Sequence, residues 1–435
     1  MREDSQQPLL EDGVPAKEWT LLRCRSRATL FLAATGLLLV SAAALAAFGL
    51  IRSSGLGLPA SSRQPFCRKS SSIAVLPRDV AADGPGSGQP GLDMVAWSGM
   101  GKHKHILDDL HAFDLTSHTW RRLRPQPGPH PTSRWKAGNA QAVQGGLVVV
   151  GGDAYWPGTF RHEYLMDVWR LGYPALGWSE ARLQPSAARP LARRGHSLAH
   201  YRGQDGLARI VLFGGRTRDK VLLNDAWEVA VLWTEEGGGQ LNATWQQLAP
   251  LQPAGEAAPA PRRGHSAVML QHPDGPQMLV YGGREDLDYY GDLWLLDIAG
   301  RSWRRLEVAA GVAPSPRDHH SAAVFQGEMV VFGGHTGLDY RHAHPAHDVW
   351  AFHLANSTWR EVKPAGPHPL PRFEEAYVQY TPPGSTEASR LLVYAGQTAH
   401  VCQLNDVYEL DMASWRWQQL AAPSFCTSEC RKRYG

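Results

Sequence analysis

The chain has 435 residues and a formal net charge of +3 at pH 7, so positive and negative side chains nearly balance. It contains no basic run, no pattern of aromatic platforms and no nucleic-acid-binding motif, and we therefore expect no nucleic-acid partner. It also lacks a nucleophile elbow and a phosphate-binding loop, and no cofactor is expected.

The first expected element is a membrane-spanning helix. No charged residue lies between Arg27 and Arg52, and residues 28–51 are rich in Leu, Ala and Val, a length that crosses a bilayer as a helix. Arginines crowd its N-terminal flank, and the positive-inside bias then places residues 1–27 in the cytosol. A cleaved signal peptide is the alternative, because residues 41–47 are mostly small.

A short stalk is expected over residues 52–70, whose first part is rich in Ser, Gly and Pro. In the tail, the stretch from Asp4 to Leu10 is similar to an acidic dileucine sorting signal. Together these features predict a single-pass type II membrane protein, whose larger part faces the lumen of the Golgi or endosomes or the cell exterior.

Residues 71–420 repeat one pattern six times: an apolar run, a glycine doublet, a loop, an Asp beside an apolar residue, and later a Trp. In the third copy the doublet is Gly214-Gly215 and the acid is Asp225. The first and last copies are degenerate, with Ser98-Gly99 and Ala395-Gly396 in place of the doublet. A period of roughly fifty residues with a glycine doublet and a late Trp is typical of kelch repeats.

On these motifs the chain resembles the kelch-repeat family after about residue 70. The resemblance implies an all-β fold, a six-bladed kelch-type β-propeller, here preceded by a single transmembrane helix. Each blade then has four strands, named a to d from the axis outward. Residues 71–76 are expected to form strand a of blade one, and the last strand d is expected to end near Leu420. Strand b, the apolar run, is expected to be buried on both faces.

The cysteines around the ends of the propeller predict how the ring closes. Cys67 precedes the first strand, Cys402 falls in the last b–c connection, and Cys426 and Cys430 lie in the C-terminal tail, residues 421–435. A disulfide from Cys67 to one of the tail cysteines would replace the missing covalent link between the first and last blades. Two bridges are expected, and all three pairings remain open.

Two sequons agree with an oxidising, lumenal compartment. Asn242 and Asn356 each begin an Asn-X-Thr triplet and are candidate glycosylation sites. The alternative is that both belong to turns before a blade Trp, where Asn and Thr are common for local hydrogen bonding.

The main candidate for ligand binding is a ring of arginines at the starts of the a strands. Aligning the repeats places one in each of blades two to six, namely Arg134, Arg193, Arg262, Arg317 and Arg372. Guanidinium groups around one mouth of the channel would suit carboxylate, sulfate or phosphate. The alternative is that each arginine pairs with an acidic residue of a neighbouring blade.

A second candidate is a histidine-rich b–c connection in blade five. It contains His335, Asp339, His342, His344 and His347, and imidazoles at short spacing bind zinc, copper or iron. The alternative is an ordinary polar loop, because the spacing matches no closed ligand set.

Long b–c loops are expected at 153–166 and 284–290, and they carry aromatic residues such as Trp156 and Tyr289. Exposed aromatic residues of this kind are typical contact anchors. We therefore expect a membrane-anchored recognition module that binds a protein or an acidic glycan on the face with the d–a and b–c connections. A metal-dependent oxidoreductase or hydrolase in the lumen is the alternative, and the sequence favours binding over catalysis.

Overall fold

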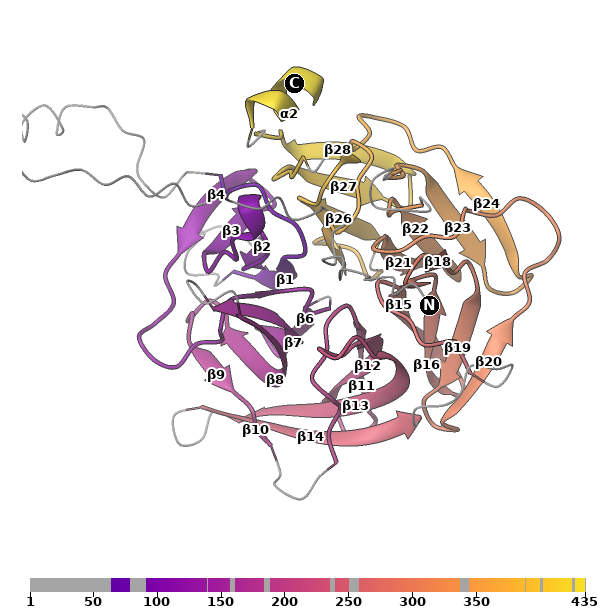
Figure 1. Cartoon of the computed structure of the whole chain (residues 1–435), viewed down its shortest axis with the longest axis horizontal. Coiled ribbons are helices and arrows are strands. Elements are labelled where there is room, and N and C mark those ends of the chain that lie inside the picture. Colours follow the sequence, from indigo (N-terminus) through magenta and orange to yellow (C-terminus); the bar gives the residue numbers. More distant parts are fainter. Residues whose placement is uncertain are drawn as a thin grey trace, which may run out of the picture. The chain divides into compact units, whose positions relative to one another are not determined.

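The computed structural model describes residues 64–434 apart from a few short internal segments, which are 79–90, 139, 157–160, 184–187, 235–238, 250–257, 337–343, 388, 400–401 and 425–426. Six main antiparallel sheets follow one another around a common axis (Figure 1). The predicted all-β six-bladed propeller is therefore confirmed. Among the described residues no helix is long and apolar enough to cross a membrane. The predicted anchor at 28–51 lies outside the described residues, as does the tail at 1–27.

Blades one and two show the repeat and its first variation. Blade one has four strands in the order β1-β2-β3-β4, which are Ser72–Pro77, Leu92–Trp97, Leu110–Asp114 and Thr119–Leu123. Blade two splits its innermost strand into two short pieces, both paired with β7, and its strands β5 to β9 are Arg134–Trp135, Gln141–Val143, Gly146–Trp156, Arg161–Gly172 and Trp178–Glu180. A short 3-10 helix, Lys102–Lys104, lies in the b–c connection of blade one.

Blades three and four have extra short strands. In blade three, β10 pairs in parallel with the outermost strand, and β10 to β14 are Arg182–Leu183, Ser197–Arg202, Ala208–Arg216, Leu222–Thr234 and Gln240–Ala249. In blade four, β17 and β18 form a small hairpin in the b–c connection, and β15 to β20 are Ser266–His272, Gly275–Tyr281, Arg284–Glu285, Asp288–Tyr289, Leu293–Asp297 and Ser302–Leu306.

Blades five and six are regular four-stranded sheets. In blade five, β21 to β24 are Ser321–Phe325, Glu328–Phe332, Val349–His353 and Thr358–Val362. In blade six, β25 to β28 are Ala376–Tyr380, Arg390–Tyr394, Val407–Asp411 and Arg416–Ala421. The short helix α2, Ser428–Tyr434, follows.

The alternating side chains of strand b hold neighbouring blades together. In β12, Ile210 and Leu212 join a core cluster shared with blade two, whereas Val211 and Phe213 join one shared with blade four. Successive strand residues point to opposite faces, so one apolar run serves two interfaces. Corresponding clusters fill the other interfaces, including the one between blades six and one. The ring is therefore closed by apolar packing as well as by polar contacts.

Residues just before blade one also fasten the ring to blade six. The backbone N–H of Arg68 donates to the carbonyl of Leu404 at 2.9 Å, and that of Gly396 donates to the carbonyl of Arg68 at 3.0 Å. Cys402 and Cys430 form a disulfide that ties α2 to the b–c connection of blade six. Cys67 is also disulfide-bonded, whereas Cys24 and Cys426 lie outside the described residues.

Two details differ from the sequence expectations. The predicted loop 153–166 is largely the end of the β7–β8 hairpin, in which Asp153 pairs with Tyr164, and the predicted loop 284–290 contains the β17–β18 hairpin. The described residues of both connections therefore form paired strands, because their alternating apolar and polar residues suit strand pairing. In blade three, strand a also begins four residues after the arginine of the repeat, at Ser197 rather than Arg193.

Candidate functional site

In each blade, a buried arginine at or just before the start of strand a forms an ion pair with an aspartate near the start of strand c. In blade three, the Nη1 and Nη2 atoms of Arg193 donate to Asp225 at 2.5 and 2.9 Å, and Nη1 also donates to the carbonyl of Gly214. The Arg193 Nε atom donates to the carbonyl of Leu191, and Trp227 Nε1 donates to the same aspartate at 2.7 Å. The network joins the segment before strand a to the end of strand b and the start of strand c within one blade.

The pair recurs in the other five blades, where the partners are Arg68–Asp109, Arg134–Asp167, Arg262–Asp292, Arg317–Asp348 and Arg372–Asp406. Sequence reasoning missed Arg68. The signal was present, because Arg68 precedes the first residue of its strand a, Ser72, by the same four positions that separate Arg193 from Ser197.

This geometry corrects the hypothesis of a ligand-binding ring formed by Arg134, Arg193, Arg262, Arg317 and Arg372. Each of the five is at most 1% exposed. Their guanidinium groups are occupied by an aspartate and by backbone carbonyls, so they stabilise the blades. The expected alternative was also inexact, because the acidic partner belongs to the same blade and not to a neighbouring one.

Two positions after each buried arginine, the backbone forms a ring around the axis. The N–H of Gly264 donates to the carbonyl of Gly195 at 2.9 Å, that of His319 to Gly264, and that of Glu374 to His319 at 3.1 Å. All members have positive φ, which glycine adopts readily and other residues adopt at a cost of about 1–2 kcal/mol. His319, Glu374 and Lys136 thus occupy positions that glycine holds in blades three and four.

Glu374 is the centre of an ionic cluster that joins residues of blades one, two, five and six. Its two carboxylate oxygens lie 2.7 Å from Lys69 Nζ and 2.7 Å from Lys136 Nζ, while His319 Nε2 lies 3.8 Å away. Burial would raise the pKa of Glu374, but the two lysines outweigh it and hold that pKa well below the usual range. The carboxylate is therefore charged at neutral pH.

For Lys136, burial outweighs the effect of the neighbouring opposite charge on the pKa. Burial lowers its pKa to about 7 against the raising effect of Glu374, and the positive charges of Arg194 and Arg263 lower it further. The Lys136 ammonium lies 4.5 Å from the ring centroid of Trp135, and the Arg194 guanidinium lies 5.4 Å from it. Several cations therefore converge on the axis from blades one to four.

We call the residues around this opening the axial mouth. In each blade it comprises the two residues after the buried arginine and the residue whose backbone pairs with the first of these two. Its members are Lys69, Ser70, Met100, Trp135, Lys136, Asp153, Arg194, Gly195, Arg216, Arg263, Gly264, Arg284, Asp318, His319, His335, Phe373, Glu374 and Gln397. The set holds six lysine or arginine residues against three carboxylates, an excess of three positive charges.

Two of the three carboxylates are already paired at the rim. Arg194 Nη1 lies 2.8 Å from Asp153, and Arg284 Nε lies 2.7 Å from Asp318. The third is Glu374, shared by two lysines. Blades three and four contribute four of the six cations of this set, Arg194, Arg216, Arg263 and Arg284, whose backbones form the β-bridges Arg194–Arg216 and Arg263–Arg284.

Below the mouth, polar side chains link neighbouring blades along the channel wall. Ser197 Oγ lies 2.8 Å from His265 Nε2, Ser266 Oγ lies 2.7 Å from His320 Nε2, and Ser321 donates to Glu375 at 2.7 Å. Burial lowers the pKa of His320 to about 3 and that of His265 well below 6.5, so these imidazoles are neutral at pH 7. Burial raises the pKa of Glu375 to about 7.

A cavity of about 80 Å³ opens along the axis between these groups, lined by Lys136, Glu374, Glu375, His320 and other axial residues. Sites that enclose organic ligands usually measure roughly 300–1,000 Å³. This cavity is therefore well below the usual size of a pocket that encloses an organic ligand.

The predicted aromatic anchors are partly used within the fold. Tyr289 is half-buried, stacks on His335 and lies within hydrogen-bond distance of its Nδ1 atom at 2.5 Å. Tyr290 lies under Arg262 at 4.4 Å. Trp156 belongs to β7, and its side chain lies outside the described residues.

The histidine-rich connection does not gather into a metal centre in its described part. His335 is buried against Tyr289 and Phe373, whereas His344 and His347 are exposed; Asp339 and His342 lie outside the described residues. Over the described part of the chain there is no group of three or more His, Cys, Asp or Glu residues placed to hold a metal ion.

Exposed apolar residues lie on the same face as the axial mouth. Phe66, Leu191, Val221 and Leu287 are 73%, 60%, 51% and 61% exposed, and all four belong to d–a or b–c connections or to the segment leading into blade one. Phe66 and Leu191 both accept the Nε–H of a buried arginine, so they lie beside the rim.

The sequons lie away from the mouth. Asn356 is exposed in the c–d turn of blade five, where its side chain accepts hydrogen bonds from the backbone and the hydroxyl of Thr358. Asn242 is half-buried in β14, with Leu232 of β13 and Arg182 of β10 as its neighbours. Glycosylation of either residue stays a prediction.

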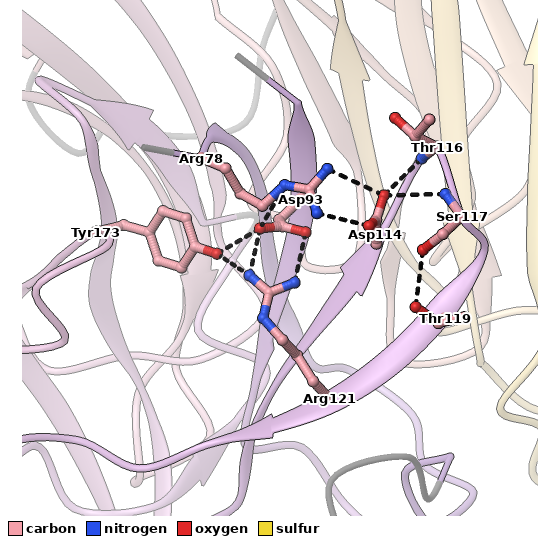
Figure 2. Close-up of polar contacts among 8 residues, drawn as sticks. All are labelled: Arg78, Asp93, Asp114, Thr116, Ser117, Thr119, Arg121 and Tyr173. Carbon is pink, nitrogen blue, oxygen red and sulfur yellow. Dashed lines mark hydrogen bonds and ion pairs between the residues drawn. The ribbon is translucent and has the colours of Figure 1, made fainter. Parts of the chain in front are cut away.

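The opposite face of blade one carries a second charged group, which we call the blade-one cluster: Arg78, Asp93, Asp114, Arg121 and Tyr173. Figure 2 shows Arg121 and Tyr173 converging on Asp93, with Arg78 bridging to Asp114. Burial would raise the pKa of Asp114, but the backbone N–H groups that it accepts and Arg78 lower it to about 2. Two cations meet two carboxylates, so the cluster is balanced.

The repeated blades, their closed ring and the Arg–Asp pair in every blade define a six-bladed kelch-type propeller. A family model described as the KLHDC2/KLHL20/DRC7 Kelch-repeats domain matches residues 88–235 and 208–433. The chain belongs to this kelch-repeat family, which confirms the resemblance seen in the sequence.

Curated proteins with similar sequences match this chain over only part of their own length. The chain is 26% identical over 353 residues to putative adagio-like protein 2 of Oryza sativa subsp. japonica, covering 77% of this chain and 48% of that protein. It is 28% identical over 252 residues to human host cell factor 2, covering 54% and 28%. With the dynein alpha chain of the Chlamydomonas reinhardtii flagellar outer arm it shares 28% identity over 266 residues, covering 58% and 5%. The chain thus spans less than half the length of these relatives.

Proposed function

We propose that the protein is a recognition module whose axial mouth binds an acidic segment of another protein. The observation that carries this proposal is the excess of positive charge on the rim, six lysine or arginine residues against three carboxylates, on the face formed by the d–a and b–c connections. Complementary charge orients an acidic partner and speeds its approach. The segment similar to this chain makes up only 28% of human host cell factor 2, which agrees with a module that serves binding.

A protein ligand fits better than an acidic glycan. Leu191, Val221 and Leu287 expose apolar side chains beside the charged rim, and such residues gain affinity by being covered. A sulfated or carboxylated sugar would satisfy the arginines but would leave these side chains in water. Binding of an acidic glycan with equal strength would therefore count against a protein ligand.

The module is anchored by residues 28–51 as a type II membrane protein, with the propeller in the lumen or outside the cell. The uncharged apolar run and its basic flank support this topology. The disulfide between Cys402 and Cys430 supports an oxidising compartment, since such bonds are rare in the cytosol. Resistance of the propeller to protease in sealed membrane vesicles tests the topology directly.

The binding proposal is tested with the full-length protein in detergent and two labelled peptides of equal length, one of Glu and Leu and one of Lys and Leu. We expect the acidic peptide to bind and the basic peptide not to bind, with affinity that falls as salt rises. Arg263→Glu should weaken binding by about tenfold or more, which corresponds to about 1.4 kcal/mol. Arg304→Glu is the matched control, because Arg304 is exposed on the outermost strand β20. Equal binding of both peptides would refute the proposal.

A further inference from the structure

The segment that leads into blade one is fixed beside the segment that leaves blade six. Gln64 Nε2 donates to the carbonyls of Asn405 and Ala422, both at 3.0 Å. The side-chain amide of Asn405 donates to the carbonyl of Pro65 at 2.7 Å and to Ser424 Oγ at 2.7 Å. These contacts define a corner of the propeller at which the two segments lie side by side.

A large apolar side chain is exposed at this corner. Phe66 is 73% exposed, although phenylalanine is among the residues most often buried. Its carbonyl accepts the Nε–H of the buried Arg68 at 3.0 Å. The next residue, Cys67, is 1% exposed, and its Sγ atom lies 2.8 Å from the carbonyl of Ser424. The backbone around Phe66 is therefore held in place, while most of the ring faces solvent.

The short helix α2 is attached close to the same corner. It begins at Ser428, four residues after Ser424, and the disulfide between Cys402 and Cys430 ties it to blade six, near β28 (Figure 1). The backbone N–H of Cys430 also donates to Thr427 Oγ1 at 3.0 Å. Because Cys430 is 5% exposed, the helix turns this residue toward the propeller and other residues toward solvent.

The residues that α2 turns to solvent include three consecutive cations. Arg431, Lys432 and Arg433 are all exposed. Within the part of the chain that the structure describes, none of their side chains has an ion pair or a hydrogen bond. The helix contains one acidic residue, Glu429, so its sequence has a positive net charge. Exposed positive charge and an exposed aromatic ring therefore occur together at one corner.

We infer that this entry corner, formed by Phe66 and the three cations of α2, binds the anionic headgroups of a membrane surface. An aromatic ring enters the boundary between headgroups and acyl chains, while lysine and arginine side chains contact the headgroups. Each basic residue near an anionic surface adds to the attraction. The inference rests on the proposed membrane anchoring, and it concerns a surface other than the axial mouth.

The position of the entry corner in the chain favours a membrane over a soluble polyanion. The apolar run at 28–51 is separated from the described residues only by the stalk, and residues 52–63 reach at most about 43 Å even when fully extended. If the apolar run is inserted as proposed, the headgroups lie within reach of the corner. A sulfated glycan would also attract the three cations, but it would leave the ring of Phe66 in water.

The test measures hydrogen exchange of the full-length protein in lipid nanodiscs, read from the peptides that contain Phe66 and α2. One set of nanodiscs holds phosphatidylcholine alone, and in the other part of it is replaced by anionic phosphatidylglycerol. We expect backbone exchange in both peptides to be about tenfold slower or more in the anionic nanodiscs, because three cations act together there. High salt should remove the difference. Equal exchange in the two kinds of nanodisc at low salt would overturn the inference.

Two triple variants locate the contact. The first combines Arg431→Ser, Lys432→Ser and Arg433→Ser. The control combines Arg301→Ser, Arg304→Ser and Arg305→Ser, which remove three exposed cations from blade four. All six residues are exposed, so both variants should keep the melting temperature of the unaltered chain. The first variant should lose the difference between the two nanodiscs, and the control should keep it. Equal behaviour of the two variants would overturn the inference.

A glycan is distinguished by adding heparin to the protein in phosphatidylcholine nanodiscs. Slower exchange of α2 with heparin, but not in anionic nanodiscs, would overturn the inference and assign the cations to a glycan.

Failure of the anchor is also separable from failure of the entry corner. If residues 28–51 do not insert, the full-length chain is mixed with preformed vesicles. Sedimentation with anionic vesicles and not with neutral ones would support binding at the corner while refuting the anchor. Sedimentation with neither kind would overturn the inference. The acidic peptide assay reports on the axial mouth in either case.

Discussion

The axial mouth and the blade-one cluster are both built from arginines and carboxylates, but they differ in balance. In the blade-one cluster, Arg78 and Arg121 meet Asp93 and Asp114, and the hydroxyl of Tyr173 donates to Asp93 at 2.5 Å. In the axial mouth, six cations face three carboxylates. Buried charges are stable in a protein when each is paired with an opposite charge. A set of charges with an excess of one sign attracts ligands of the opposite sign. The comparison therefore predicts a structural role for the blade-one cluster and, under the proposed function, a binding role for the axial mouth.

The largest expected effect is a loss of folding stability when one charge of the balanced blade-one cluster is removed. Asp93 is fully buried, and Asp93→Asn would leave Arg121 without its carboxylate partner. Breaking one partner of a buried pair costs about 3–5 kcal/mol. We expect this loss in denaturant unfolding of the propeller, with ligand binding at the mouth unchanged in the folded fraction.

Asp205→Asn is the matched control for that loss. Asp205 pairs with Arg209 at a more exposed place in blade three, and exposed pairs contribute about 0–1 kcal/mol. If Asp93→Asn were as mild as Asp205→Asn, the blade-one cluster would not be a structural site, and the contrast with the axial mouth would fail.

A second effect is expected from the neutral imidazoles beneath the mouth. Burial lowers the pKa of both His196 and His320 to about 3, and an unfolded histidine titrates near 6.5. Between these values the unfolded chain binds more protons, so the free energy of unfolding falls as pH falls from about 6.5 toward 3. Each histidine should contribute a loss of about 2 kcal/mol at pH 5, at about 1.4 kcal/mol per pH unit.

The pH profile has an opposing contribution from Glu375. Burial raises its pKa to about 7, so between about 4.5 and 7 the folded state binds the extra proton and gains stability as pH falls. One carboxyl cannot cancel several histidines. The measurement is the denaturation midpoint from pH 7 to pH 5 for the unaltered chain and for His320→Gln. A slope unchanged by that substitution would show that His320 titrates normally when folded.

The parts of the fold that repeat were predictable from sequence, and the parts that do not repeat were not. The glycine doublets and the Asp-X-Trp pattern are local and recur six times, which identified the propeller. The sequence predicted that Arg193 could have an acidic partner but not which blade supplies it. A single sequence does not distinguish an aspartate of the same blade from one of the neighbouring blade. Glu374, Lys69 and Lys136 were missed altogether. They join blades six, one and two, and Glu374 and Lys136 stand at the positions that glycine holds in blades three and four. Aligning those axial positions would have revealed charged residues where Gly195 and Gly264 stand.

The third prediction tests the unbalanced side of the comparison. Arg263→Met removes one cation of the axial mouth. If Arg263 serves binding, the free energy of unfolding should change by less than about 1 kcal/mol, within the range of ordinary surface changes and unlike Asp93→Asn. Binding of the acidic peptide should nevertheless weaken about tenfold. A stability loss comparable to that of Asp93→Asn would instead make Arg263 part of the structure, and the charge excess would then need no external partner.

The smallest effect is expected from the apolar residues beside the rim. Leu287 is exposed at the tip of the β17–β18 hairpin, so Leu287→Ser should leave the melting temperature unchanged and weaken peptide binding about fivefold, the equivalent of about 1 kcal/mol of lost apolar contact. Leu232→Ser is the control, because Leu232 is an exposed leucine on β13 that lies toward the opposite face. If both substitutions weakened binding equally, the ligand would not be confined to the face of the axial mouth, and charge alone would no longer explain where it binds.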